Sequence, residues 1–131
     1  MKALLCKSYG PPENLLIEEV PDLEPGAGEA VVQVYAASLN FPDTLQIQGK
    51  YQFQPPMPFS PGSEVGGVIL KLGQGVTGFS VGDRVMATPS IGGMAELVRC
   101  AAAGLRKIPD SLDFKTAAGF AMVYTTSYHA L

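Results

Sequence analysis

The chain has 131 residues, of which 47% are hydrophobic and 16% are charged, and its formal net charge is −3. This length and composition fit one globular domain with a hydrophobic core. The weak acidity argues against a nucleic-acid or membrane-surface role, because both need a basic patch. The N-terminal apolar run is too short for a signal peptide, and no segment approaches the roughly 20 apolar residues of a membrane span.

Glycine and proline occur at short intervals along the chain, which predicts many short strands. The 15 glycines and 11 prolines give turn signals roughly every 8 to 12 residues, a spacing typical of an all-β domain. The expected strands, in chain order, cover residues 3–7, 15–20, 30–36, 65–72, 84–88 and 94–99. The fold class predicted from these elements is therefore mainly β with short helices.

Only two segments carry helical signals. Residues 42–49 begin with proline and end with glycine, the asymmetry of a short helix. Near the C-terminus, Ser111 and Asp113 can cap a helical stretch that runs on to Leu131. No glycine, proline or cap closes that second helix, so we expect the protein to continue beyond the chain.

Residues 73–78, Gly-Gln-Gly-Val-Thr-Gly, match the dinucleotide-binding pattern G-x-G-x-x-G. In a dinucleotide-binding fold these glycines follow a strand and open a helix whose N-terminus faces the pyrophosphate. Here a strand precedes the glycines, but residues 79–85 indicate a loop that leads into another strand. We therefore expect a glycine turn between two strands, and the sequence offers no other phosphate cradle.

The two cysteines, Cys6 and Cys100, lie far apart in the sequence and form no motif. This arrangement favours two buried, reduced thiols in a cytoplasmic protein over a disulfide. The predicted location is therefore the cytoplasm.

Three segments in order, Pro58–Ile69, Gly82–Val85 and Gly93–Val98, resemble the N-terminal domain of medium-chain dehydrogenases/reductases. That domain is a GroES-like, partly open β-barrel with a few short helices. The stretches Tyr9–Leu15 and Ala37–Asp43 are similar to those of the quinone oxidoreductase branch.

The resemblance covers essentially the whole chain and implies its domain organisation. Residues 1–131 would form the GroES-like N-terminal catalytic domain, and residues 113–131 would begin the helical connection to an absent Rossmann domain. The 131-residue chain alone would then be inactive, because the family's cofactor is held mainly by that second domain.

The residues at the family's metal-ligand positions indicate whether this chain can bind a catalytic zinc ion. The zinc alcohol dehydrogenases of this superfamily have cysteine, histidine and cysteine where this chain has Asn40, Ser63 and, near the same place, Met122. A catalytic zinc needs three nitrogen, sulfur or carboxylate ligands, and these three residues are poor substitutes. The resemblance therefore implies a zinc-independent enzyme. Glu64, which lies next to the zinc ligands in zinc members, is expected here to satisfy backbone groups near the cleft.

The resemblance also implies the residues of a site. Asn40, Asp43 and Tyr51 match polar groups that orient the acceptor carbonyl and stabilise the oxyanion in that branch. Asn40 can donate to a carbonyl or to the nicotinamide ribose. Thr126 matches a threonine that contacts the nicotinamide end of the cofactor. Tyr51 is expected at the mouth of the cleft, in the loop 49–58.

Each of these residues also has a structural interpretation. Asn40 can cap the short helix that follows it, and Asp43 can sit in the first turn of that helix. Tyr51 can be a partly buried loop residue, and Thr126 can bond to the preceding helical turn. His129 is expected at a domain interface or in solvent. The aromatic residues Phe41, Phe53 and Phe59 can wall an acceptor site, but the core is the favoured place for each.

The resemblance implies an NADPH-dependent, zinc-independent quinone oxidoreductase that transfers hydride to a quinone or enone. The full-length protein would be a homodimer without nucleic-acid or membrane partners. An enoyl-thioester reductase of the same superfamily is the alternative enzyme, since it also uses a cleft tyrosine. A stand-alone, non-catalytic GroES-like binding module is the alternative from another class, because this fold does not by itself imply catalysis.

Overall fold

The computed structural model describes all residues from Met1 to Leu131 and contains seven strands and three α-helices. The strands are β1 (Lys2–Leu5), β2 (Leu16–Glu19), β3 (Glu29–Ala37), β4 (Val65–Leu72), β5 (Arg84–Ala87), β6 (Leu97–Ala101) and β7 (Leu105–Lys107). The α-helices are α1 (Phe41–Gln46), α2 (Phe114–Ala118) and α3 (Ala121–Ala130), with 3₁₀ turns at Pro12–Asn14 and Ala102–Gly104.

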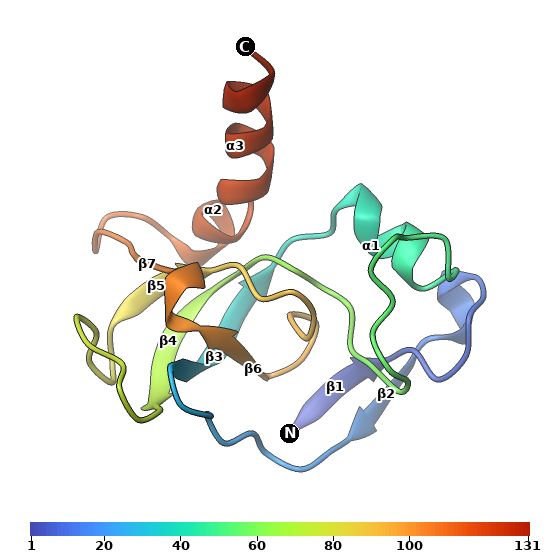
Figure 1. Ribbon diagram of the computed structural model, residues 1–131, viewed down its shortest axis with the longest axis horizontal. Helices are drawn as coiled ribbons and strands as arrows, with labels where there is room; N and C mark the ends of the chain where they lie inside the picture. Colours follow the sequence, from blue (N-terminus) through green and yellow to red (C-terminus); the bar gives the residue numbers. More distant parts are fainter.

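The strands form two antiparallel sheets. Strands β1 and β2 pair with each other, and the larger sheet has the order β6-β3-β4-β5-β7. Isolated bridges from Ala3 to Ala95 and from Cys6 to Phe59 tie the small sheet to the rest of the chain. The sheets do not close into a continuous barrel, so the prediction of a mainly β, partly open architecture is confirmed (Figure 1).

The core lies on the inner face of the larger sheet. It consists of small and branched apolar side chains, which suit a pleated, buried surface. Its nine buried members are Ala30, Val32, Val65, Ile69, Val85, Ala87, Val98, Cys100 and Leu105. Both cysteines are buried and free, as predicted, and burial raises the pKa of each thiol.

The structure departs from the predicted elements in three places. Strand β6 begins at Leu97 rather than at residue 94, because the three residues before it bond to β1, although the Glu96 carbonyl also accepts the Val34 N–H of β3. Strand β7 was not predicted, since three residues carry too little pattern to be recognised. The tail is two helices rather than one, because the chain turns at Gly119 and Phe120 between α2 and α3.

Helix α2 lies against strands β3, β4 and β5. Gly66 permits this approach, because a Cβ atom there would stand 2.5 Å from the carbonyl oxygen of Phe114. Arg84 holds the same helix: its guanidinium lies 4.5 Å from the centre of the Phe114 ring. That guanidinium also donates to the carbonyl oxygens of Pro109 and Leu112 at 2.9 and 2.7 Å. The segment leading into α3 is therefore firmly attached to the sheet.

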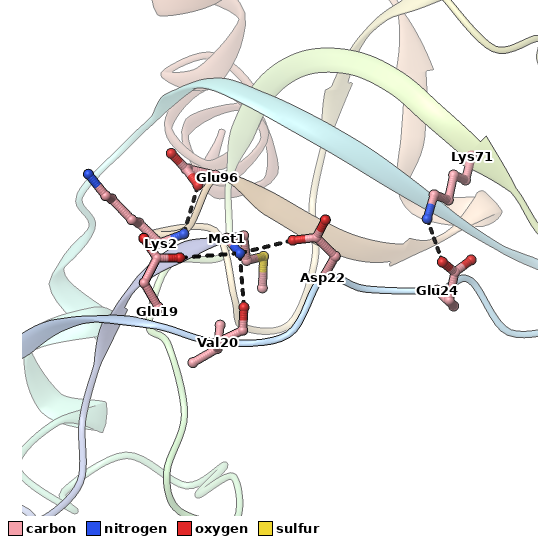
Figure 2. A network of polar contacts seen from close by, with 8 residues as sticks. All are labelled: Met1, Lys2, Glu19, Val20, Asp22, Glu24, Lys71 and Glu96. Atoms are coloured by element: carbon pink, nitrogen blue, oxygen red, sulfur yellow. Dashed lines mark hydrogen bonds and ion pairs between the residues drawn. The ribbon is translucent and has the colours of Figure 1, made fainter.

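A polar network fixes the start of β1 (Figure 2). The α-amino group of Met1 donates to the Val20 carbonyl and to Asp22 Oδ1, both at 2.9 Å. The hydrogen bond to Asp22 raises the pKa of that amino group. The Lys2 N–H donates to Glu96 Oε2 at 2.7 Å, which joins β1 to the segment before β6.

Residues 73–78 form a glycine turn, as predicted. Strand β4 ends at Leu72 and the next regular element is strand β5, so no helix follows the glycines. Gly75 and Gly78 have φ angles of 82° and 81°, a conformation that glycine adopts without strain. The segment is a connection between two strands.

None of the helices is both long and apolar enough to cross a membrane. Helix α3 projects away from the sheets and carries the C-terminus (Figure 1). None of its residues is buried.

Candidate functional site

The centre of the candidate site is Glu64, which immediately precedes β4 and is only 1% exposed. Its Oε2 atom accepts the Ser38 hydroxyl at 2.6 Å and the Asn40 side-chain nitrogen at 3.2 Å. Its Oε1 atom accepts the Met122 backbone N–H at 2.8 Å. A buried carboxylate is costly unless hydrogen bonds satisfy it, and these three bonds do so. They also join the end of β3, the start of β4 and the start of α3.

Asn40 and Asp43 lie together at the start of α1. Asn40 is the N-cap of the helix, and the two residues form a capping box around its first turn. Asp43 is 4% exposed, and its Oδ2 atom accepts the Asn40 backbone N–H at 2.8 Å. The structural interpretation of both residues is thus confirmed. It does not compete with a role in the site, since the cap fixes the position of the Asn40 side chain.

Tyr51 lies in the loop that follows α1 and is half-buried. Three side-chain bonds brace this loop. Gln46, buried at the end of α1, donates to the Phe53 carbonyl at 3.4 Å. Gln54 donates to the Gly49 carbonyl at 2.7 Å and accepts the Tyr9 hydroxyl at 3.1 Å. The phenol of Tyr51 takes no part in the network around Glu64.

Thr126 lies on α3, exposed, four residues after Met122 and therefore on the same face of the helix. It borders a hollow of about 410 Å³ between α3 and the strands β5 and β7. The opposite wall of this hollow includes Thr88 and Arg106. Neither Asn40 nor Tyr51 lines it. The structure therefore links Thr126 to Asn40 only indirectly, through Met122 and Glu64.

A second hollow of about 410 Å³ lies between α1 and the N-terminal hairpin. It is mostly apolar, and Asp43 and Thr44 are its polar lining residues.

The favoured placement of the three phenylalanines in the core is right for one of them. Phe59 is 3% exposed and packs with Cys6 and Ile47. Phe41 and Phe53 are instead 73% and 47% exposed. Both lie close in sequence to the polar residues of the site. The apolar character of a residue does not by itself show whether the fold buries its side chain, so the sequence could not separate these two from Phe59. His129 is exposed on α3.

Ser38 is a residue of the site that sequence reasoning missed. Its hydroxyl donates to Glu64 and accepts the Asn40 side-chain nitrogen at 2.9 Å. The available signal was its position two residues before Asn40, because alternate residues of an extended segment point to the same side. The expectation that Glu64 satisfies a backbone group is confirmed by the Met122 N–H.

The donor set around Glu64 does not suit zinc. Asn40 contributes an amide nitrogen that donates to oxygen atoms, and Met122 enters the network through its backbone N–H. No group of three or more histidine, cysteine, aspartate and glutamate side chains is arranged to hold a metal ion. The polar side chains instead hold one another.

Comparison with known proteins identifies the fold. Residues 26–110 match the family described as the alcohol dehydrogenase GroES-like domain. The chain belongs to this family.

Two relatives make the relationship more specific. The chain is 39% identical over 132 residues to the quinone oxidoreductase-like protein 2 homolog of Nematostella vectensis, covering 99% of this chain and 36% of that protein. It is 35% identical over 133 residues to the human quinone oxidoreductase, covering 100% of this chain and 40% of that protein. The chain thus spans well under half the length of these relatives.

Solved structures agree. The human synaptic vesicle membrane protein VAT-1 homolog-like protein superposes with a TM-score of 0.96 at 36% identity, over 100% of this chain and 42% of that one. The Escherichia coli quinone oxidoreductase complexed with NADPH gives 0.94 at 28% identity, over 100% of this chain and 40% of that one. The predicted resemblance to the quinone oxidoreductases of the medium-chain superfamily is confirmed.

Proposed function

We propose that this chain is the substrate-side, N-terminal catalytic domain of an NADPH-dependent, zinc-independent quinone oxidoreductase. The observation that carries the proposal is the network in which buried Glu64 holds Asn40 and the start of α3. Relatives that match over the whole of this chain are named quinone oxidoreductases, and the solved structure of the Escherichia coli quinone oxidoreductase is a complex with NADPH. Residues 113–131 would lead from this domain into a nucleotide-binding domain.

The proposed chemistry is the reduction of a quinone or enone, for which bound NADPH supplies the hydride. This chain would orient the acceptor and stabilise the negative charge that develops on its carbonyl oxygen. Asn40 and Tyr51 are the proposed donors to that oxygen. Asp43 acts through Asn40, since its carboxylate fixes the backbone from which Asn40 projects. Thr126 is the proposed contact to the nicotinamide end.

Most of the cofactor would lie on the other domain, because the glycines at 73–78 form a turn between strands. No phosphate cradle was found elsewhere in the sequence. Zinc independence is supported by the chemistry of the side chains at Asn40, Ser63 and Met122, none of which is a usual zinc ligand. We further propose that the full-length protein is a cytoplasmic homodimer without nucleic-acid or membrane partners.

The test is steady-state kinetics of the full-length protein with NADPH and two acceptor classes, quinones and enoyl thioesters. We expect turnover of quinones. Turnover of thioesters alone would reassign the protein to the enoyl-thioester reductases. If neither acceptor supports the oxidation of NADPH, the result would favour a non-catalytic GroES-like binding module. Metal analysis of the purified protein is expected to give far less than one zinc per chain, and a stoichiometric zinc content would contradict the proposal.

A further inference from the structure

We infer that Glu64 is a positioning residue that orients the Asn40 side chain as a hydrogen-bond donor toward the ligand. The ligand group that binds to Asn40 is then a hydrogen-bond acceptor, namely a carbonyl oxygen. The identity of the ligand rests on the proposed function. The orientation of the Asn40 amide does not, because it follows from contacts within this chain.

The first step concerns which end of the amide faces inward. Ser38 Oγ lies 2.6 Å from Glu64 Oε2, the usual length of a hydroxyl bond to a carboxylate. The Ser38 hydroxyl therefore donates its proton to Glu64, and toward Asn40 it can act only as an acceptor. An ionised carboxylate also only accepts. Both neighbours thus require the nitrogen end of the amide, at 2.9 Å from Ser38 and 3.2 Å from Glu64.

The second step concerns which hydrogen-bonding group of the Asn40 amide remains free. Its oxygen lies on the helix side, in the capping box with Asp43, whose backbone N–H donates to the Asn40 backbone carbonyl at 3.0 Å. On the nitrogen side, Ser38 Oγ and Glu64 Oε2 are themselves only 2.6 Å apart. Seen from the nitrogen, they are closer in direction than the two N–H bonds of an amide, so both lie on the side of one hydrogen, which serves both. A side-chain amide nitrogen carries two hydrogens. The second hydrogen points elsewhere, and the half-buried position of Asn40 leaves it accessible.

The third step concerns chemistry. An N–H donor complements a carbonyl oxygen on which negative charge develops, whereas it does not complement a hydroxyl that must itself donate. The carboxylate behind the amide holds it in one orientation, so that the outward N–H keeps a fixed direction toward the ligand. Glu64 itself does not reach the ligand. It acts through Asn40, and through Met122 it holds the helix that carries Thr126.

The orientation can be measured in the unsubstituted chain by NMR. The sequence has only two asparagines, Asn14 and Asn40, and Asn14 is exposed, so it is an internal reference. We expect one of the two side-chain amide protons of Asn40 to exchange with solvent roughly 10-fold or more slowly than those of Asn14. Equal exchange of all four protons would overturn the proposed orientation.

The functional arm uses two variants of the full-length protein. In Glu64→Gln, the new amide can still accept from Met122 but turns a donor toward Asn40, so the Asn40 nitrogen loses the carboxylate as an acceptor and keeps only the Ser38 hydroxyl. We expect kcat with a quinone to fall on the order of 100-fold, the usual effect of losing one such donor, with a smaller change in the KM for NADPH. An unchanged kcat would overturn the inference.

The double variant Glu64→Gln with Asn40→Asp is the matched control. It restores the network with reversed polarity, because the amide introduced at position 64 would donate to a carboxylate at position 40, but it leaves no outward N–H. We expect the melting temperature to recover while kcat stays low. Recovery of both would show that the network is merely structural and would overturn the donor role. If the unsubstituted protein reduces no quinone, the proposed function fails, and the amide exchange of Asn40 alone decides the positioning role of Glu64.

Discussion

Glu64 Oε1 and the Met122 backbone N–H lie 2.8 Å apart, although 58 residues separate them in the sequence. This bond fixes the first turn of α3 to the start of β4. It is important for the geometry of the site because no residue of α3 is buried, so few other contacts hold the helix. The same carboxylate holds Asn40. One buried side chain thus sets the positions of two elements that the proposed function requires.

Tyr51 is the second proposed donor, and removal of its hydroxyl tests this. In the full-length protein, we expect Tyr51→Phe to lower quinone turnover by roughly 10-fold or more, because one hydrogen bond to the developing oxyanion is lost. The loop itself should keep its shape, since Gln46 and Gln54 brace it. Tyr35→Phe is the matched control, because Tyr35 stacks on Phe114 away from this loop. Steady-state kinetics decide the matter, and unchanged kinetics of Tyr51→Phe would make Tyr51 a structural residue.

Cofactor affinity provides an independent prediction for the 131-residue chain alone. The glycines at 73–78 open no helix, so the chain lacks the helix N-terminus that binds a pyrophosphate. We expect no binding of NADPH at micromolar concentrations and no quinone turnover by this chain. Isothermal titration and energy transfer to the nicotinamide measure the binding. A clear titration in the micromolar range would show that this domain holds the cofactor by itself.

The sequence predicted the parts of the fold that depend on local pattern. Strand β4 has the predicted limits, because an apolar run there is bounded by turn residues. The place of Asn40 just before Pro42 likewise allowed it to be interpreted as the cap of α1. Contacts between distant segments were not predictable in this way. The bond from Ser38 to Glu64 spans 26 residues, and nothing in either local pattern indicates that the two side chains meet.

The substitution Gly67→Ala tests whether the missing side chain at this position allows β3 and β4 to approach so closely. A Cβ atom there would collide with the Gln33 carbonyl oxygen on the neighbouring strand. We expect Gly67→Ala to lower the free energy of unfolding by about 1 to 3 kcal/mol, because the two strands must move apart. Gly119→Ala is the control, since its Cβ would meet nothing closer than 3.7 Å. Urea denaturation compares the two variants, and equal stabilities would mean that the sheet accommodates the methyl group.

Asp113 caps α2 by accepting the Thr116 backbone N–H at 2.7 Å. That bond lowers the pKa of the Asp113 carboxyl below its ordinary value of 3.8. A lowered pKa in the folded state means that the cap contributes stability above pH 3.8, and that this contribution is lost as the pH falls through the lowered value. We therefore expect Asp113→Ala to lower the melting temperature at neutral pH and to have a shrinking effect in acid.

Ser111→Ala is the control for this cap, because Ser111 was the other residue in the sequence able to cap the helix, and the structure assigns the N-cap to Asp113. Its melting temperature should match that of the unsubstituted chain throughout. Thermal unfolding followed by circular dichroism, from about pH 7 down to about pH 2, follows the loss of this contribution as the pH falls below the ordinary carboxyl pKa and gives both comparisons. An Asp113→Ala effect of constant size across this range would show that the ionised carboxylate does not stabilise the helix. The stability of the segment that leads into α3 would then depend on the contacts of Arg84 with Phe114, Pro109 and Leu112.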